Sequence, residues 1–344
     1  SLKTSIKTIT YLSDTGCLEI QGASLAMAVS IAEYLGQRTD VDQQIVPVAK
    51  GTQIQCPFMD RTCDKASKVK NPTPPVCSVR KPDGTVWIVC EHRLCSTRQK
   101  KTVIVNGRKK QIENILVEHQ RDILRKVAKL IYQDPELQDS EIGVRREVNI
   151  PLPDSDNSYH ADYVMRNFSG RGRVDEVLLE MQGGGETSST GEITRHIAAW
   201  ADLEFPTNEI LRQPVAANTI ETNAWRRQQE QFLVKGNVVD QTGGKIVFAV
   251  GSLLYDYLHR RFRNANLRDL KAHNWTLCIL AFKEDTSDEP RPGPIPLIID
   301  DSKTLFTNYS TFVRFLTDQG APRPELFEGS FLRLDNSSVT IMPR

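Results

Sequence analysis

The stretch Val177–Glu186, "VLLEMQGGGE", begins as an apolar run and ends in three consecutive glycines. An apolar run without alternation is typical of a strand buried on both faces, so we expect this strand in the middle of a sheet. The glycines end the strand and permit positive φ angles or the close approach of a ligand or another backbone. Glu180 and Gln182 are two residues apart, so they point to the same side where the strand opens toward the surface.

The composition is that of a globular chain without extreme charge. Its 344 residues suffice for one large core or two domains. The 44 basic and 43 acidic residues give no general attraction to nucleic acid, so any basic surface must be local. No apolar run is long enough to span a membrane, and the first residues lack the apolar segment of a secretion signal. We therefore expect a cytoplasmic protein without a membrane partner.

The order of apolar patterns predicts an α/β or α+β fold, with a mixed sheet flanked by helices. We expect an N-terminal helical segment over 1–50, a cysteine-rich segment over 51–100, and the core of the fold over 101–344. Helical spacing predicts helices at 24–38, 114–133, 191–204 and 222–236. Strands are expected at 147–152, 160–168, 174–182 and 275–283, and 245–262 should hold a strand or buried helix start followed by a helix.

Five of the seven cysteines fall within forty residues: Cys56, Cys63, Cys77, Cys90 and Cys95. In a cytoplasmic chain such clustering favours a metal site over disulfides. The surrounding segment is rich in proline and poor in helix formers, so it cannot bury much core of its own, and a metal would compensate. The spacing lacks the CxxC pairs of zinc proteins, and four thiolates suit either zinc or iron.

Asp162 lies on the strand that precedes Glu180, across a hairpin marked by Gly170 and Gly172. Two neighbouring strands can therefore bring Asp162, Glu180 and Gln182 together. This arrangement is a variant of the D…(D/E)xK pattern of Mg²⁺-dependent nucleases, with Gln in place of Lys. Facing carboxylates repel, and a divalent cation removes that cost while it polarises a phosphate and activates water. The alternative is a strand end whose polar residues are simply solvated.

The chain resembles the NotI family of type II restriction endonucleases over nearly its whole length. The resemblance lies in an ordered set of motifs: "SIAEYLGQR", "CPF" followed by further cysteines and "WIVC", "LLEMQ", "AWRRQQEQFLVKG" and "EPRPGPIPL". It implies a PD-(D/E)xK nuclease core with DNA-recognition elements over 101–344, in which Asp162 and Glu180 bind Mg²⁺. Glu147 would assist a second metal or a water, and Gln182 would position the attacking water. It also implies a structural iron or zinc site formed by four cysteines, Cys56, Cys63, Cys77 and Cys90. Cys95 could replace Cys90 in that set.

The resemblance implies a homodimer that cuts both strands of a palindromic site in double-stranded DNA, with a leaning toward long, GC-rich sites. Two alternatives remain at this point. One is a repair or phage-associated nuclease without sequence specificity. The other is an inactive, metal-stapled DNA-binding protein, for which Gln182 in place of Lys is the best argument.

Contacts to DNA phosphates should come from the places where basic residues are densest. Outside the cysteine region these are Arg226, Arg227, Arg260, Arg261, Arg263 and Arg268. The stretch "RQKKTVIVNGRKK" at 98–110 is the next candidate.

Overall fold

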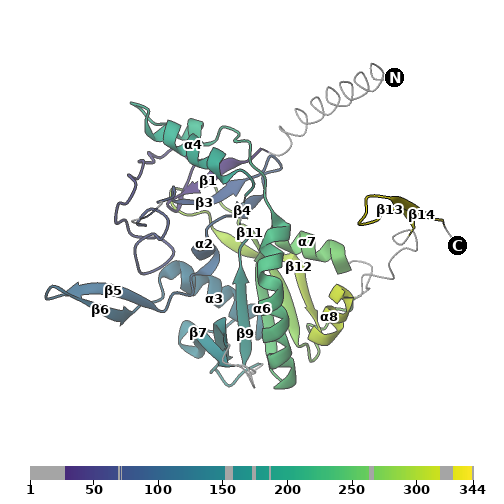
Figure 1. The fold of residues 1–344 in the computed structure, drawn as a ribbon. Coiled ribbons are helices and arrows are strands. Elements are labelled where there is room, and N and C mark those ends of the chain that lie inside the picture. Colours follow the sequence, from purple (N-terminus) through teal and green to yellow (C-terminus); the bar gives the residue numbers. More distant parts are fainter. Residues whose placement is uncertain are drawn as a thin grey trace, which may run out of the picture.

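A computed structural model describes residues 28–68, 70, 72–151, 158–172, 176–185, 187–262, 267–317 and 328–342. The mixed α/β architecture expected from the sequence is confirmed. A six-stranded sheet forms the centre and helices cover both of its faces (Figure 1).

The large sheet has the strand order β12-β11-β10-β9-β8-β7. Its interior strand β9 (Val177–Gln182) is antiparallel to β8 (Ser158–Asn167) and parallel to β10 (Lys245–Gly251). The strand expected from "VLLEMQ" is therefore confirmed as a central one. The sheet continues with β11 (Leu277–Glu284) and ends at β12 (Leu297–Thr307) on one side and β7 (Ile142–Pro151) on the other.

Alternate residues of β9 pack into two different cores, one on each face of the sheet. Leu179 packs on the face covered by α3 (Glu118–Ile131), which is the helix expected within 114–133. Leu178 packs on the opposite face, in the same core as side chains of three further helices. These are α6 (Glu221–Gln241), α7 (Ser252–Phe262) and α8 (Tyr309–Thr317).

A second, antiparallel sheet has the order β2-β1-β3-β4. Its strands are β2 (Gln37–Arg38), β1 (Ser30–Tyr34), β3 (Val76–Arg80) and β4 (Val86–Ile88), so it combines chain from 1–50 and from 51–100. The short helix α2 (Glu91–Cys95) follows β4, and α4 (Thr190–Ala201) and α5 (Asn208–Leu211) lie between β9 and α6 along the chain.

The helix predicted at 24–38 is wrong for the described part of that range. Residues 30–38 form β1 and β2, joined by a tight turn in which Leu35 and Gly36 have positive φ. Ile31, Ala32 and Tyr34 are all buried, so β1 is buried on both faces, and its short apolar run has the spacing of a helix as well as of a strand. Gly36 serves this turn and not a helix C-terminus, and residues 1–27 lie outside the described part.

Glu33, in the middle of β1, is fully buried and forms hydrogen bonds with residues of three other segments. Its carboxylate accepts hydrogen bonds from Arg93 Nε at 2.7 Å, from the Ser78 hydroxyl at 2.5 Å and from the Ile295 amide at 2.8 Å. Burial works against charge on Glu33, but Arg93 and the other donors lower its pKa. This network joins β1, β3, α2 and the loop before β12.

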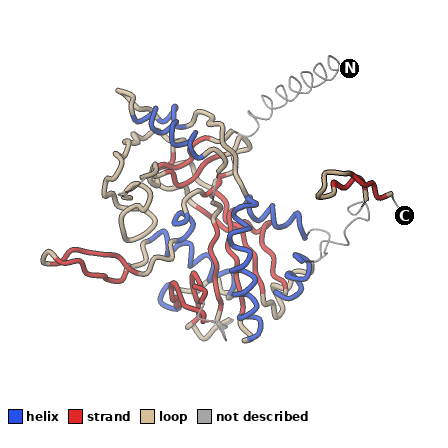
Figure 2. Tube along the Cα trace, viewed as in Figure 1, coloured by secondary structure: helices blue, strands red, loops and turns tan. Residues whose placement is uncertain are grey.

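The remaining elements are a hairpin of β5 (Lys100–Val105) and β6 (Arg108–Glu113), the 3-10 turn η1 (Asp139–Glu141), and the pair β13 (Gly329–Leu332) and β14 (Ser338–Ile341). Figure 2 shows the β5–β6 hairpin as a red tube that extends from the body of the molecule. Within the described ranges, no helix combines the length and apolarity needed to cross a membrane.

The packing of α6 against α8 gives a prediction about stability. A Cβ added at Gly236 would overlap the ring of Tyr309. We expect Gly236→Ala to lower the free energy of unfolding by about 1–3 kcal/mol, measured by urea titration, because the two helices must move apart. The control is Gly191→Ala in α4, where a Cβ would meet no atom within 4 Å. It should leave stability unchanged or raise it, since Ala favours helix. Equal effects of the two substitutions would contradict this packing.

Candidate active site and cysteine cluster

Three acidic residues lie opposite one another on three adjacent strands. The pairing of Tyr163 with Leu179 in β8 and β9 places Asp162 opposite Glu180. On the other side of β8, the pairs Arg146–Tyr163 and Val148–Ala161 place Glu147 opposite Asp162. The structure thus brings together the three carboxylates predicted from the sequence.

Glu180 is the most deeply placed of the three and has one buried cation beside it. Its Oε2 accepts a hydrogen bond from Lys235 Nζ at 2.7 Å, and both side chains are almost wholly buried. Burial, and next the charge of Asp162, raises the pKa of Glu180 to about 8, although Lys235 acts in the opposite direction. Its second oxygen, Oε1, is buried without a hydrogen-bond partner among the described residues. The single positive charge of Lys235 therefore does not neutralise the two carboxylates of Glu180 and Asp162.

Asp162 and Glu147 are held by backbone amides. Asp162 Oδ2 accepts the Met181 amide at 2.8 Å, and Glu147 Oε2 accepts the Gln99 amide at 3.1 Å. Burial raises the pKa of Asp162, and the charge of Glu147 adds to that effect. Glu147 has a φ of 47°, in the left-handed region, which L residues adopt at a cost that is common at functional sites.

The side-chain amide of Gln182 is held by two hydrogen bonds to neutral partners. Its Oε1 accepts a hydrogen bond from Gln228 of α6 at 2.8 Å, and its Nε2 donates to the Gly184 carbonyl. The lysine that pairs with Glu180 comes from the same helix. Gln228, Gln231 and Lys235 follow one another at spacings of three and four, which places them on one face of α6.

Lys235 is a site residue that was not predicted from the sequence. The signal available was a lysine between apolar residues in "FLVKG", on the face of an amphipathic helix that also carries the glutamines. A charged residue at a buried helical position is rare unless it is paired.

The three glycines accommodate another backbone. Gly184 forms a bridge with Ile88 at the end of β4, and the Gly185 amide donates to the Ile88 carbonyl at 2.9 Å. A Cβ at Gly184 would lie 2.5 Å from that carbonyl oxygen, and one at Gly183 would lie 2.8 Å from the Ile88 side chain. Two of the glycines therefore let the strand that leads to Cys90 approach the end of β9. Glu186 lies outside the described residues.

A cavity of about 720 Å³ lies between β8 and the end of β9 on one side and the cysteine-rich segment on the other. Asp162, Met181 and Gln182 line one part of it, and Cys63 and Cys90 line another. Such a volume is typical of ligand-binding clefts. Of the three carboxylates, Asp162 is the one that lines this open space.

The four cysteines assigned from the resemblance gather in one buried cluster: Cys56, Cys63, Cys77 and Cys90. All are reduced, and backbone amides point at two of the sulfurs: the Gly36 amide donates to Cys77 Sγ at 3.3 Å and the Phe58 amide to Cys56 Sγ at 3.4 Å. Amide donors of this kind support thiolate ligands.

Burial raises the pKa of the Cys56 thiol to about 12 and also raises those of Cys77 and Cys90, so a cation is required to make these groups thiolates. The donor set fits iron or zinc. No three of the four sulfurs lie within 4.8 Å of one another in the described structure, so the side chains must shift to share one metal.

Cys95 lies apart from this cluster. It packs in the core beneath α3, and its sulfur is 3.3 Å from the Tyr163 hydroxyl. Of the two candidates left open by the sequence, Cys90 is therefore the one whose position suits the four-cysteine site.

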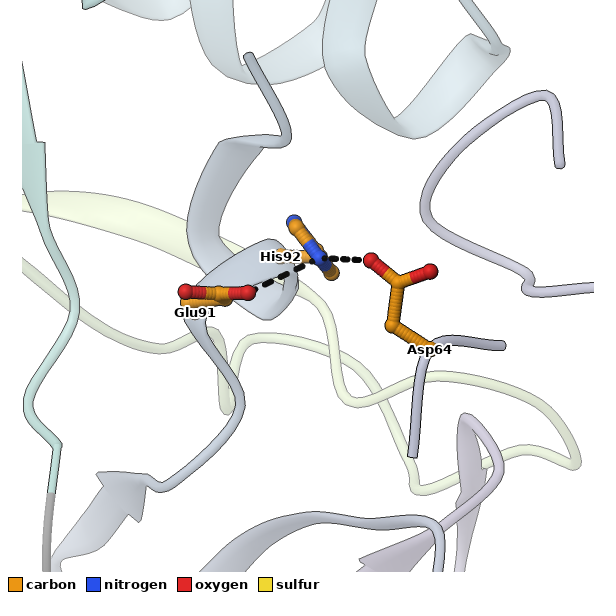
Figure 3. Close-up of side chains that lie close together, drawn as sticks. All are labelled: Asp64, Glu91 and His92. Atoms are coloured by element: carbon orange, nitrogen blue, oxygen red, sulfur yellow. Dashed lines mark hydrogen bonds and ion pairs between the residues drawn. The ribbon is translucent and has the colours of Figure 1, made fainter. Parts of the chain in front are cut away.

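A separate group beside the cysteines contains Asp64, Glu91 and His92 (Figure 3). His92 Nε2 lies 2.9 Å from Asp64 Oδ2 and 3.2 Å from Glu91 Oε1. Hydrogen bonds with His92 lower the pKa of both carboxyls, and despite its burial they raise the pKa of His92. Arg61 pairs with Asp64 and Arg98 with Glu91, so neighbouring side chains already neutralise the negative charge of the two carboxylates. The group ties the loop of Cys63 to the helix after Cys90.

The predicted DNA-contacting arginines are spread over several places. Arg227 lines the cavity, and Arg226 is exposed on the same helix. Arg260, Arg261 and Arg268 are exposed but do not line the cavity, and Arg263 lies outside the described residues.

No protein-family model matches the chain. A stretch of 34 residues is 79% identical to Uncharacterized protein YuaK of Escherichia coli strain K12. The match covers 10% of this chain and 36% of that protein, so the chain spans about a third of the length of this curated relative. Its name carries no activity that could be transferred.

The raised pKa of Glu180 predicts that metal binding depends on pH. Below about pH 8 a cation must displace a proton from this carboxyl, so affinity should rise about tenfold per pH unit from pH 6 and level off above 8. Isothermal titration with Ca²⁺ at several pH values measures this. Glu180→Gln should bind weakly and without the same pH dependence. A flat profile for the unaltered protein would remove Glu180 from the metal site.

The cysteine cluster predicts bound metal with a structural role. Cys63→Ser or Cys77→Ser should lose iron or zinc by elemental analysis and unfold at a lower temperature, because metal binding supplies folding free energy to a segment with little core. Cys95→Ser is the matched control and should keep its metal, since Cys95 lies outside the cluster. Metal-free but equally stable protein in every variant and in the unaltered chain would contradict the site.

Proposed function

We propose that this chain is a divalent-metal-dependent endonuclease acting on double-stranded DNA, and that it cuts as a sequence-specific type II restriction endonuclease. One observation carries the nuclease proposal. Asp162 and Glu180 face each other beside a cavity with a buried lysine, Lys235, against the second carboxylate. Strongly perturbed carboxyls next to a cleft are typical of functional sites.

Asp162 and Glu180 would hold Mg²⁺, which when bound supplies charge stabilisation and an activated water. The partnerless Oε1 of Glu180 and the raised pKa values of both groups fit a missing positive charge at this place. Glu147, opposite Asp162 on β7, would supply a further oxygen for a second metal or a water, and its side chain must shift to share a metal with the other two carboxylates. Asp162 keeps its orientation through the Met181 amide, so the site is fixed before a ligand arrives.

The positive charge that Gln182 cannot provide is supplied in this proposal by Lys235. A glutamine carries no positive charge and is no effective base. In this chain the ammonium group reaches Glu180 from α6, while Gln182 and Gln228 form the neutral wall between that helix and the strand. The proposed division of roles is that Lys235 supplies the cation and Gln182 orients a water or phosphate oxygen.

Sequence specificity, a homodimer and a palindromic, GC-rich site are proposed from the resemblance to the NotI family, as is a cytoplasmic location. The near balance of acids and bases supports a specific enzyme over a purely electrostatic DNA binder, because binding must then rest on localised contacts. A non-specific nuclease of the same fold is the second candidate, and the carboxylate row favours it equally.

Incubation of the purified protein with genomic DNA and Mg²⁺ separates these functions. A restriction endonuclease gives discrete bands whose ends share one sequence, and a non-specific nuclease gives a smear. Intact DNA after incubation of well-folded, metal-loaded protein would contradict both.

Substitutions in the site should separate its parts. Asp162→Asn and Glu180→Gln should abolish cleavage, and Lys235→Met should slow it by about 10²–10³, the usual cost of one transition-state stabiliser. Adding Gln182→Lys to Lys235→Met should restore part of the rate, because the cation then comes from β9. Cleavage rates under single-turnover conditions measure these effects.

The matched control is Lys245→Met. Lys245 is also buried in the sheet, but it pairs with Val177 at the opposite end of β9 and donates to Asn274 and Trp275. Its loss should reduce stability and leave the cleavage rate of folded protein unchanged. Unimpaired cleavage by Lys235→Met would refute the role of that lysine.

A further inference from the structure

The β5–β6 hairpin stands out from the molecule as a separate arm (Figure 1). Its strands pair with each other from Lys100–Glu113 at the base to Val105–Arg108 at the tip and join no other sheet. Asn106 and Gly107, both with positive φ, form the two-residue turn that suits a twisted hairpin. The arm is therefore a regular ribbon held by local sequence and not by the core.

The outer half of the arm is strongly basic. Arg108, Lys109 and Lys110 follow the turn on β6, and all three are exposed. They make no ion pair within the described structure, whereas Lys101 at the base pairs with Asp60 at 2.5 Å. Neighbouring pairs of a hairpin alternate between its two faces, so these three cations are distributed over both faces. Ile104, 74% exposed, lies opposite Lys109, and Val105, 48% exposed, lies opposite Arg108.

The base of the arm is fixed beside the carboxylate row. The Gln99 amide donates to Glu147 Oε2 at 3.1 Å, and the Asn114 amide closes the base by donating to the Gln99 carbonyl at 2.8 Å. Arg98, one residue before, lines the same cavity as Asp162. A ligand bound at the carboxylates thus lies next to the root of the arm.

We propose that this hairpin is a DNA-binding arm that enters a groove of the duplex flanking the cleaved bond, with Arg108, Lys109 and Lys110 on phosphates. The inference rests on the proposed function and adds to it a surface outside the carboxylate site. A two-stranded ribbon fits the width of the major groove, and cations on both faces suit a groove with phosphates on either side. The exposed apolar side chains near the turn can contact thymine methyl groups.

The charge of the arm favours DNA over a second copy of the chain as the occupant. Two arms in a symmetric dimer would bring like charges together, and a nearly neutral protein offers no general acidic partner for them.

The test compares duplex binding by two triple variants in an Asp162→Asn background, which prevents cleavage. One carries Arg108→Gln, Lys109→Gln and Lys110→Gln. The other carries Lys50→Gln, Arg212→Gln and Arg291→Gln, which removes equal charge from exposed positions elsewhere. The probe is a labelled mixed-sequence duplex of about 40 base pairs, titrated at several salt concentrations. Circular dichroism checks the fold, and sedimentation velocity the assembly state.

We expect the arm variant to bind on the order of tenfold more weakly at low salt, with a log–log salt slope reduced by between about 1 and about 3. The control variant should match the parent. If the parent binds the duplex and the arm variant keeps its affinity and slope, the arm inference fails while the proposed function stands. A parent that binds no duplex at all overturns both. An arm variant whose salt slope is unchanged but whose sedimentation coefficient shifts would assign the arm to self-association and overturn the inference.

Discussion

The ion pair between Glu180 and Lys235 is the contact on which the rest of the site depends. It joins the central strand to the longest described helix at 2.7 Å, in a place where both groups have lost their water. A buried pair is costly unless further groups satisfy it, and here Asp162 adds a second negative charge. The apolar layers of α6 and β10 fix the two partners, so the fold maintains an electrostatic imbalance beside a cavity. That imbalance supports the metal proposed at this place.

The glycine run extends this constraint to the cysteine region. Because Gly183 and Gly184 lack side chains, the end of β4 lies against the end of β9, and the chain then continues directly into Cys90 and α2. Arg93 of α2 binds the buried Glu33 of β1. A metal held by the cysteines would thus stabilise one wall of the same cavity whose other wall carries Asp162. The cysteine cluster can support the site without taking part in its chemistry.

The sequence predicted those features that depend on local pattern. The two-sided apolar run of β9 identified a central strand, and the hairpin between β8 and β9 placed Asp162 near Glu180. Lys235 could not be found in this way, because its partner is 55 residues away and its burial depends on how α6 crosses the sheet. The helix prediction for the segment 30–38 was wrong because of its local pattern. β1 is buried on both faces, and its short apolar run has no period that distinguishes strand from helix. The fully buried Glu33 inside it is explained only by donors from distant segments.

The position of Lys235 also explains why a glutamine suits position 182. A lysine at 182 would bring a second ammonium group toward the end of β9, beside Arg227, which already lines the cavity. The amide of Gln182 instead accepts from Gln228 and donates to Gly184, both neutral partners, and so closes the contact between α6 and the glycine run without adding charge. With the cation supplied from the helix, the strand needs only a neutral group that fits the close backbone approach. The change from Lys to Gln in the motif is therefore consistent with a relocated positive charge and does not by itself indicate a lost activity.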